Sequence, residues 1–124
     1  MKIKKYLPAI LIVFGVIAIL LIWGRQQNSP AAVSSTDKIF FYGDTCPHCK
    51  NVEEFMAANG TRNKLSFQEL EVYNNQANAK LLGQTAQKCG LDTSAGIGVP
   101  FFYDGSKCLM GDQDIINYFK QLWI

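Results

Sequence analysis

The chain has 124 residues, of which 48% are hydrophobic and 12% aromatic, so it can form one modest packed domain and is too apolar for a disordered chain. Its formal net charge of +2 hides an asymmetry, because four of the 12 Lys and Arg residues lie within residues 1–25. From Asp37 onward, eight Lys and Arg face ten Asp and Glu, which gives that part a charge near −2. A mildly acidic domain without a basic cluster argues against nucleic acid as a partner.

The N-terminal segment is predicted to be an uncleaved signal-anchor. Residues 1–5 form a basic tail, and residues 6–23 carry no charge and are rich in Ile, Leu and Val. As a helix they would span about 27 Å, close to the ~30 Å hydrocarbon core of a bilayer. Tyr6 and Trp23 lie at the two ends, where aromatic rings favour the headgroup region. The alternative is a cleaved signal peptide, with residues 29–32 (SPAA) as the cleavage region.

Both interpretations give the same single-pass topology. The lysines before the span place the N-terminus in the cytoplasm, and the rest of the chain lies outside it, as in a bacterial-type cell envelope. Disulfides can persist there. Residues 24–37 are small and polar and predict a flexible linker.

Residues 38–124 predict an α/β domain with the order β-α-β-α-β-β-α. The strands are expected over residues 38–42, 65–72, 99–103 and 107–111, and the helices over residues 46–58, 75–89 and 112–124. The opening β-α-β unit implies parallel strands with a right-handed crossover. Asp104-Gly105-Ser106 predicts a hairpin between the last two strands, and Asp112 is the expected N-cap of the last helix.

The motif Cys46-Pro47-His48-Cys49 opens the first helix of this domain. Cysteines at i and i+3 share one helix face and can be bridged. As the N-cap, Cys46 would hold its sulfur over unpaired N–H groups, where the helix dipole favours the nucleophilic thiolate. Pro47 suits the first helical position because its missing N–H costs nothing there. Cys49, deeper in the helix, is then the resolving thiol.

His48 is expected to tune this pair. An imidazolium or imidazole N–H beside Cys46 would favour the thiolate and make the disulfide a stronger oxidant. The alternative for His48 is an exposed helix residue without such a role.

Other chemistry for the two cysteines is less well supported. Structural zinc needs four ligands, and a c-type haem needs His where Lys50 follows Cys49, so no cofactor is expected. Copper(I), which accepts two soft thiolates, stays open. A purely structural disulfide between Cys46 and Cys49 would close a loop too short to restrict the unfolded chain much.

The element order, the TCPHC motif and the stretch GVPFF opening the third strand resemble the thioredoxin superfamily, over residues 38–124. The chain is most similar to small glutaredoxin-like members, and its Pro-His dipeptide to DsbA-like oxidases. The resemblance implies a thioredoxin-like fold. It also implies a cis Pro100 beside the dithiol, with the backbone of Val99 pairing with an extended substrate. GDQD (residues 111–114) only partly resembles the glutaredoxin Gly-Gly-x-Asp region, so no glutathione site is assigned.

Cys89 and Cys108 lie outside that pattern. A structural disulfide between them would stabilise the fold by about 3 kcal/mol in the chain-entropy model. Two free buried thiols, or a second redox pair relaying electrons to the motif, are the alternatives.

The expected function is that of a monomeric, membrane-tethered extracytoplasmic thiol–disulfide oxidoreductase, an oxidase or reductase of secreted proteins. Its expected partners are protein thiols and disulfides, the lipid bilayer, and a membrane or soluble redox partner. The alternative is a thioredoxin-like copper-handling (metallochaperone) module. The lack of a third soft ligand argues against it, because the nearest methionine, Met56, lies two turns away from the thiolates. A binding-only module is a third option.

Overall fold

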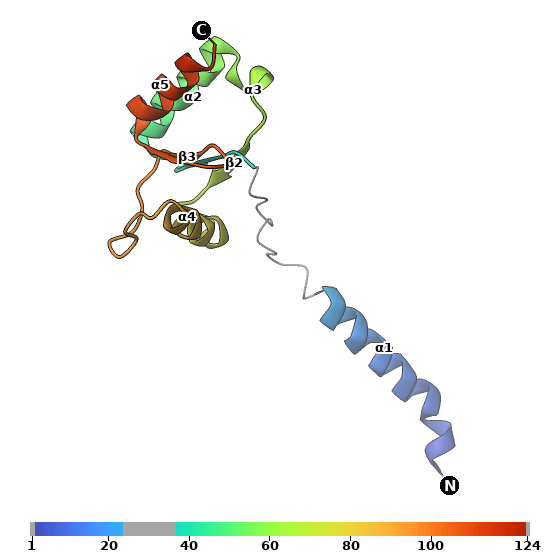
Figure 1. Ribbon diagram of the computed structural model, residues 1–124. Helices are drawn as coiled ribbons and strands as arrows, with labels where there is room; N and C mark the ends of the chain where they lie inside the picture. Colours follow the sequence, from blue (N-terminus) through green and yellow to red (C-terminus); the bar gives the residue numbers. More distant parts are fainter. Residues whose placement is uncertain (1, 24–36, 124) are drawn as a thin grey trace.

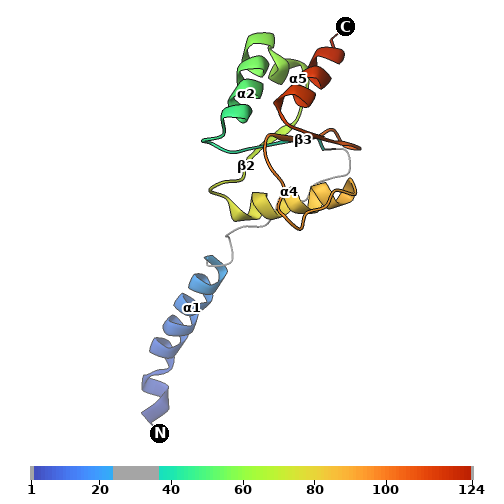
Figure 2. The same cartoon turned by 90° about the vertical axis from the view of Figure 1, so that its left-hand side faces the viewer.

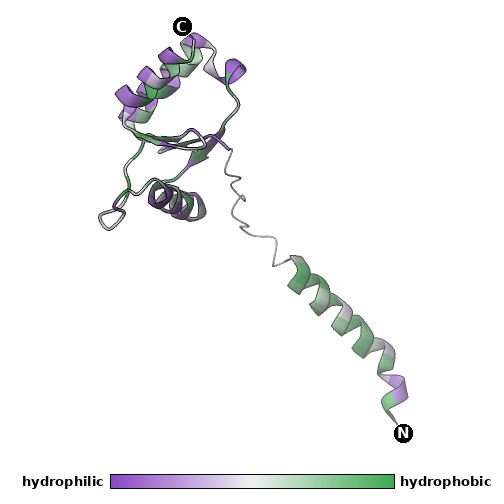
Figure 3. Cartoon of the chain, viewed as in Figure 1, coloured by the Kyte–Doolittle hydropathy of each residue, from purple (hydrophilic) through white to green (hydrophobic). Residues whose placement is uncertain are grey.

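The computed structural model describes residues 2–23 and 37–123. A short 3-10 helix, η1 (Lys2–Lys5), precedes an apolar helix, α1 (Leu7–Trp23), of 17 residues (Figure 3). Within the described ranges, no helix reaches the length and apolarity that crossing a membrane requires. The transmembrane helix predicted over residues 6–23 is therefore not found, since the observed helix is shorter than the prediction. The predicted linker falls almost wholly on residues 24–36, outside the described residues.

A mixed sheet forms the centre of the domain. Its four strands are β1 (Ile39–Tyr42), β2 (Gln68–Glu71), β3 (Phe101–Tyr103) and β4 (Cys108–Met110), in the spatial order β2-β1-β3-β4. β1 pairs with β2 in parallel, as the predicted β-α-β unit requires, and with β3 in the antiparallel sense. β3 and β4 form the predicted antiparallel hairpin.

Helices cover both faces of this sheet. α2 (Pro47–Asn59) and α5 (Asp112–Gln121) lie side by side on one face, and α4 (Gln76–Lys88) covers the other (Figures 1 and 2). A single turn, α3 (Thr61–Lys64), follows α2. The domain is thus an α/β fold with three layers.

The side chains of the central strands alternate between two cores because successive residues of a strand point to opposite faces. On the α2–α5 side the fully buried residues include Phe40, Phe102 and Phe119, whereas Phe41 and Phe101 pack on the α4 side. The predicted strand residues are therefore core on both faces. This buried centre fixes the ends of β1 and β3, from which the dithiol loop and the Val99-Pro100 segment emerge.

The predicted element order is confirmed, with differences at the boundaries. Gly60 takes a left-handed conformation (φ 62°) that ends α2, and the chain then winds the unpredicted turn α3. β2 is shorter than the predicted strand at residues 65–72. The N-cap of α5 is Gly111 and not Asp112 as predicted; Asp112 is instead the first helical residue, and its carboxylate faces α2.

Cys89 and Cys108 form a disulfide that joins the end of α4 to β4, with their Cα atoms 6.1 Å apart. Cys108 is paired in register with Tyr103, the β3 residue farthest from Pro100. Both cysteines are partly buried against the core on the α4 side. Of the three alternatives for these residues, free thiols are excluded by this pairing, and the position at the far end of β3 favours the structural role over the electron relay.

Candidate functional site

The loop after β1 delivers Cys46 to the start of α2. The amide of Cys46 donates to the carbonyl oxygen of Gly43 at 3.2 Å, which closes a tight turn. Cys46 has extended backbone angles (φ −87°, ψ 113°) and is the N-cap of α2, with Pro47 as the first helical residue. The amide of Cys49 donates to Cys46 Sγ at 3.1 Å. The predicted cap is therefore present, with sulfur in place of the usual capping oxygen.

Cys46 and Cys49 form a disulfide, and their Cα atoms are 5.2 Å apart. Cys46 has 5% of its surface exposed and Cys49 has 1%. Both are buried by ordinary standards, but Cys46 is the more accessible of the two. An incoming thiolate would therefore meet Cys46 first.

Two groups act on Cys46 Sγ in opposite directions. The Cys49 amide and the N-terminus of α2 favour an anion, by about 1.5–3 kcal/mol for a charged hydrogen bond and about 0.3–1 kcal/mol for the dipole. The carbonyl oxygen of Val99 lies 3.6 Å from the same sulfur and, in the reduced protein, would accept a hydrogen bond from the thiol. A thiol is a weak donor. The N–H groups of the first turn are therefore the stronger of these two influences on the sulfur.

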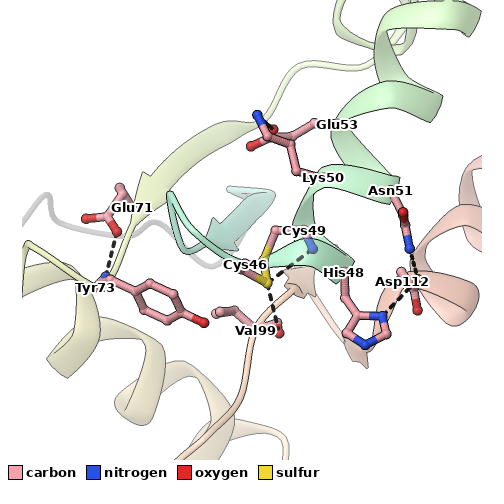
Figure 4. The surroundings of a disulfide bond; sticks show 10 residues. All are labelled: Cys46, His48, Cys49, Lys50, Asn51, Glu53, Glu71, Tyr73, Val99 and Asp112. Carbon is pink, nitrogen blue, oxygen red and sulfur yellow. Dashed lines mark hydrogen bonds and ion pairs between the residues drawn. A yellow bond between two sulfur atoms is a disulfide. The ribbon is translucent and has the colours of Figure 1, made fainter.

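His48 faces α5 rather than Cys46 (Figure 4). Its Nδ1 lies 3.2 Å from Asp112 Oδ2, and the imidazole is 71% exposed. Asn51 Nδ2 donates to the same carboxylate oxygen at 2.6 Å. His48 is thus held at the dithiol turn by a carboxylate, so any effect of its charge on Cys46 is partly cancelled by Asp112.

Asp112 and Asn51 were not predicted as site residues. Asn51 is three residues after His48, hence on the same face of α2, and that spacing was the available signal. Two hydrogen bonds lower the pKa of the Asp112 carboxyl below its usual range. The larger effect comes from Asn51 and the smaller one from His48. The carboxylate therefore ties the first turns of α2 and α5 together as an anion.

Asp112→Asn is expected to make the free energy of unfolding fall less steeply than in the wild type as the pH is lowered. A carboxyl whose pKa is lower in the folded state stabilises the fold above the unfolded pKa of about 3.9, and that contribution is lost as the pH falls through the folded value. The matched control is Asp114→Asn, which removes an exposed charge from the same first turn of α5. Urea unfolding at neutral pH and at acid pH measures both. Equal behaviour of the two variants would contradict a special role for Asp112.

The peptide bond between Val99 and Pro100 is cis, as the resemblance implied. Pro100 is buried, and its carbonyl oxygen accepts from the amide of Gly111 at 3.0 Å. Val99 lies between the dithiol and the α4 side of the domain (Figure 4). The structure thus brings the two predicted substrate-binding residues to the predicted cysteines.

Tyr73 is a third residue near the dithiol that the sequence did not single out. Its ring lies directly against Gly43, and a Cβ atom at that position would collide with it. The backbone of Tyr73 is held by its amide, which donates to Glu71 Oε1 at 2.7 Å. Gly43 therefore lets Tyr73 lie over the loop that leads to Cys46.

The donor groups around the dithiol do not form a larger metal site. Within residues 2–23 and 37–123, no three His, Cys, Asp or Glu side chains gather in a way that could hold a metal ion.

Comparisons with protein-family models, with curated proteins and with solved structures found no match to this chain. The function must therefore be argued from the site itself. Its defining features are a helix-capping cysteine, its disulfide partner one turn later, and a cis X-Pro segment beside the sulfur.

Proposed function

We propose that the chain is a thiol–disulfide oxidoreductase of the thioredoxin superfamily, with Cys46 as the exchanging cysteine and Cys49 as its partner. The observation that carries the proposal is the position of Cys46 Sγ: it caps α2, accepts the Cys49 amide and lies against Val99. The strand and helix order and the cis Val99-Pro100 bond support the same assignment.

The exchange proceeds in two balanced steps. A substrate thiolate attacks Cys46 Sγ, the Cys46–Cys49 bond breaks, and Cys49 leaves as a thiolate that takes up a proton. A second substrate thiolate then attacks the substrate sulfur of the mixed disulfide, and Cys46 leaves. The substrate gains a disulfide and the protein is left as the dithiol, so the two electrons come from the substrate.

Oxidation of substrates is the favoured direction. A leaving group departs faster when its thiolate is more stable, and the N-terminus of α2 stabilises that of Cys46. The disulfide between Cys89 and Cys108 supports an oxidising, extracytoplasmic compartment, since such bonds are rare in the cytosol. We propose secreted proteins as the substrates.

The test is catalysed oxidation of a reduced, unfolded protein together with the reduction potential of the dithiol. The proposal expects turnover and a potential well above the value near −270 mV that is typical of thioredoxin. Retention of copper(I) by the reduced chain without any turnover would instead indicate a copper-handling module. If the chain shows no turnover and no exchange with a small dithiol, the motif is an inert structural disulfide.

A further inference from the structure

A cavity of about 370 Å³ opens beside the dithiol, between α4 and the segment that leads to Pro100. Its lining includes Val72 and Tyr73 after β2, Leu82 and Gly83 of α4, and Ile97 and Val99 of the segment before Pro100. Such a volume is at the lower end of the range for small-ligand pockets, and fits one bulky side chain.

One residue, Val99, separates the cavity from the reacting sulfur. Val99 lines it, and the carbonyl oxygen of the same residue is 3.6 Å from Cys46 Sγ. Tyr73 also lines it, and its ring covers Gly43 in the loop before Cys46. A group entering the cavity would therefore lie next to a substrate held on Cys46.

The chemistry of the lining selects an apolar occupant. None of the described residues that line the cavity carries a charge. Leu82 is buried, and Val72 and Ile97 pack against the core from the cavity side. Charged side chains would lose their hydration there without gaining a partner, whereas an aliphatic or aromatic side chain would leave water for an apolar wall.

Glycines keep the cavity open. A Cβ atom added at Gly83 would meet no atom within 4 Å, and the same holds at Gly98. Gly83 lies inside α4, where glycine is less favourable than alanine by about 1 kcal/mol. Alanine at this position would stabilise α4 and would fit without a clash, so neither helix propensity nor packing explains the glycine.

We propose that this cavity binds one bulky apolar side chain of a peptide substrate, one or two residues from the cysteine that exchanges with Cys46. The inference rests on the proposed oxidoreductase function and names its substrate class. An extended peptide advances about 3.3 Å per residue, so a mixed disulfide on Cys46 places the neighbouring side chains along Val99 and over the opening. Unfolded chains with an aliphatic or aromatic residue near a cysteine are then the preferred substrates.

The test compares two reduced dithiol peptides that differ only beside the reacting cysteine, one with leucine and one with serine. The full chain is expected to oxidise the leucine peptide roughly tenfold faster at low peptide concentration, as burial of one such side chain implies. In Gly83→Leu the new side chain fills the cavity, so the two peptides should react at nearly equal rates. Exchange with a small dithiol such as dithiothreitol should stay at the wild-type rate.

The matched control is Gln84→Leu, which adds the same side chain at the next, exposed position of α4, outside the cavity lining. It should retain the preference for leucine. A second variant, Gly83→Ala, should raise the melting temperature because of its higher helix propensity, and should lower the preference partly. Loss of preference in a more stable protein cannot be attributed to misfolding.

The outcomes separate this inference from the function on which it rests. Exchange with dithiothreitol but no preference between the peptides, or a preference that Gly83→Leu leaves intact, would overturn the apolar subsite and leave the oxidoreductase standing. No exchange with any thiol by the wild-type chain would overturn both. A preference lost in Gly83→Leu and kept in Gln84→Leu supports the subsite.

Discussion

Replacement of Cys46 by serine is expected to reduce thiol–disulfide exchange to the uncatalysed rate. Cys46 is the more accessible residue of the pair, and the substitution removes the sulfur that caps α2. Serine is a favoured N-cap residue, so α2 should still begin at Pro47 and the variant should fold. Oxidation of a reduced test protein measures the loss.

The control for Cys46→Ser is the double variant Cys89→Ser, Cys108→Ser, which removes the other disulfide. It should lower the free energy of unfolding by about 3 kcal/mol, yet exchange at a temperature where it is folded should stay at the wild-type rate. Catalysis that survives in Cys46→Ser, or disappears in the double variant while it is folded, would show that the active pair has been misassigned.

Replacement of Cys49 by alanine is expected to arrest the reaction halfway. In the variant, the Cys46 thiolate attacks a disulfide-bonded substrate, one substrate sulfur leaves, and the mixed disulfide that remains has no resolving thiol. Because Cys49 is almost completely buried, substrate access to Cys46 should be little changed. Adducts of higher mass should accumulate on non-reducing gels and collapse on addition of a reductant.

The corresponding control removes both cysteines of the motif, Cys46→Ser with Cys49→Ala, and should form no adducts. Adducts that persist in this control would have to involve other residues. A Cys49→Ala protein that turns over at the wild-type rate would contradict the role of Cys49 as the partner of Cys46.

The sequence predicted the core of this domain because its signals are local. Alternating and fully apolar runs marked the strands, and the cap motif of Cys46 and Pro47 depends only on the first turn of one helix. α3 was missed because a single turn has no periodicity to detect, and it exists because Gly60 redirects the chain. The N-cap of α5 was predicted one residue too late because Asp112 is a good capping residue in isolation.

The unpredicted site residues are those that depend on contacts between distant segments. Asp112 meets His48 and Asn51 across 64 and 61 positions of sequence. Tyr73 reaches Gly43 only because β1 and β2 are adjacent and parallel. Local patterns carry no information on such pairs, so the tuning of His48 was predicted from its neighbours in sequence, whereas its observed partner lies on another helix.

These contacts alter the expected contribution of His48. Since Asp112 pairs with it, the sulfur depends mainly on the Cys49 amide and the N-terminus of α2 for the stability of its anion. Removal of the His48 side chain should therefore change the reduction potential of the dithiol less than the Pro-His motif suggests.

The most direct measurement is a titration of Cys46 in the reduced full chain, followed by the ultraviolet absorbance of the thiolate. A cap sulfur held by backbone N–H groups should ionise with a midpoint below the value of about 8.5 for free cysteine. The double variant Cys46→Ser, Cys49→Ala supplies the baseline. A midpoint at or above that of free cysteine would contradict the account, because the first turn of α2 would then not stabilise the reacting anion.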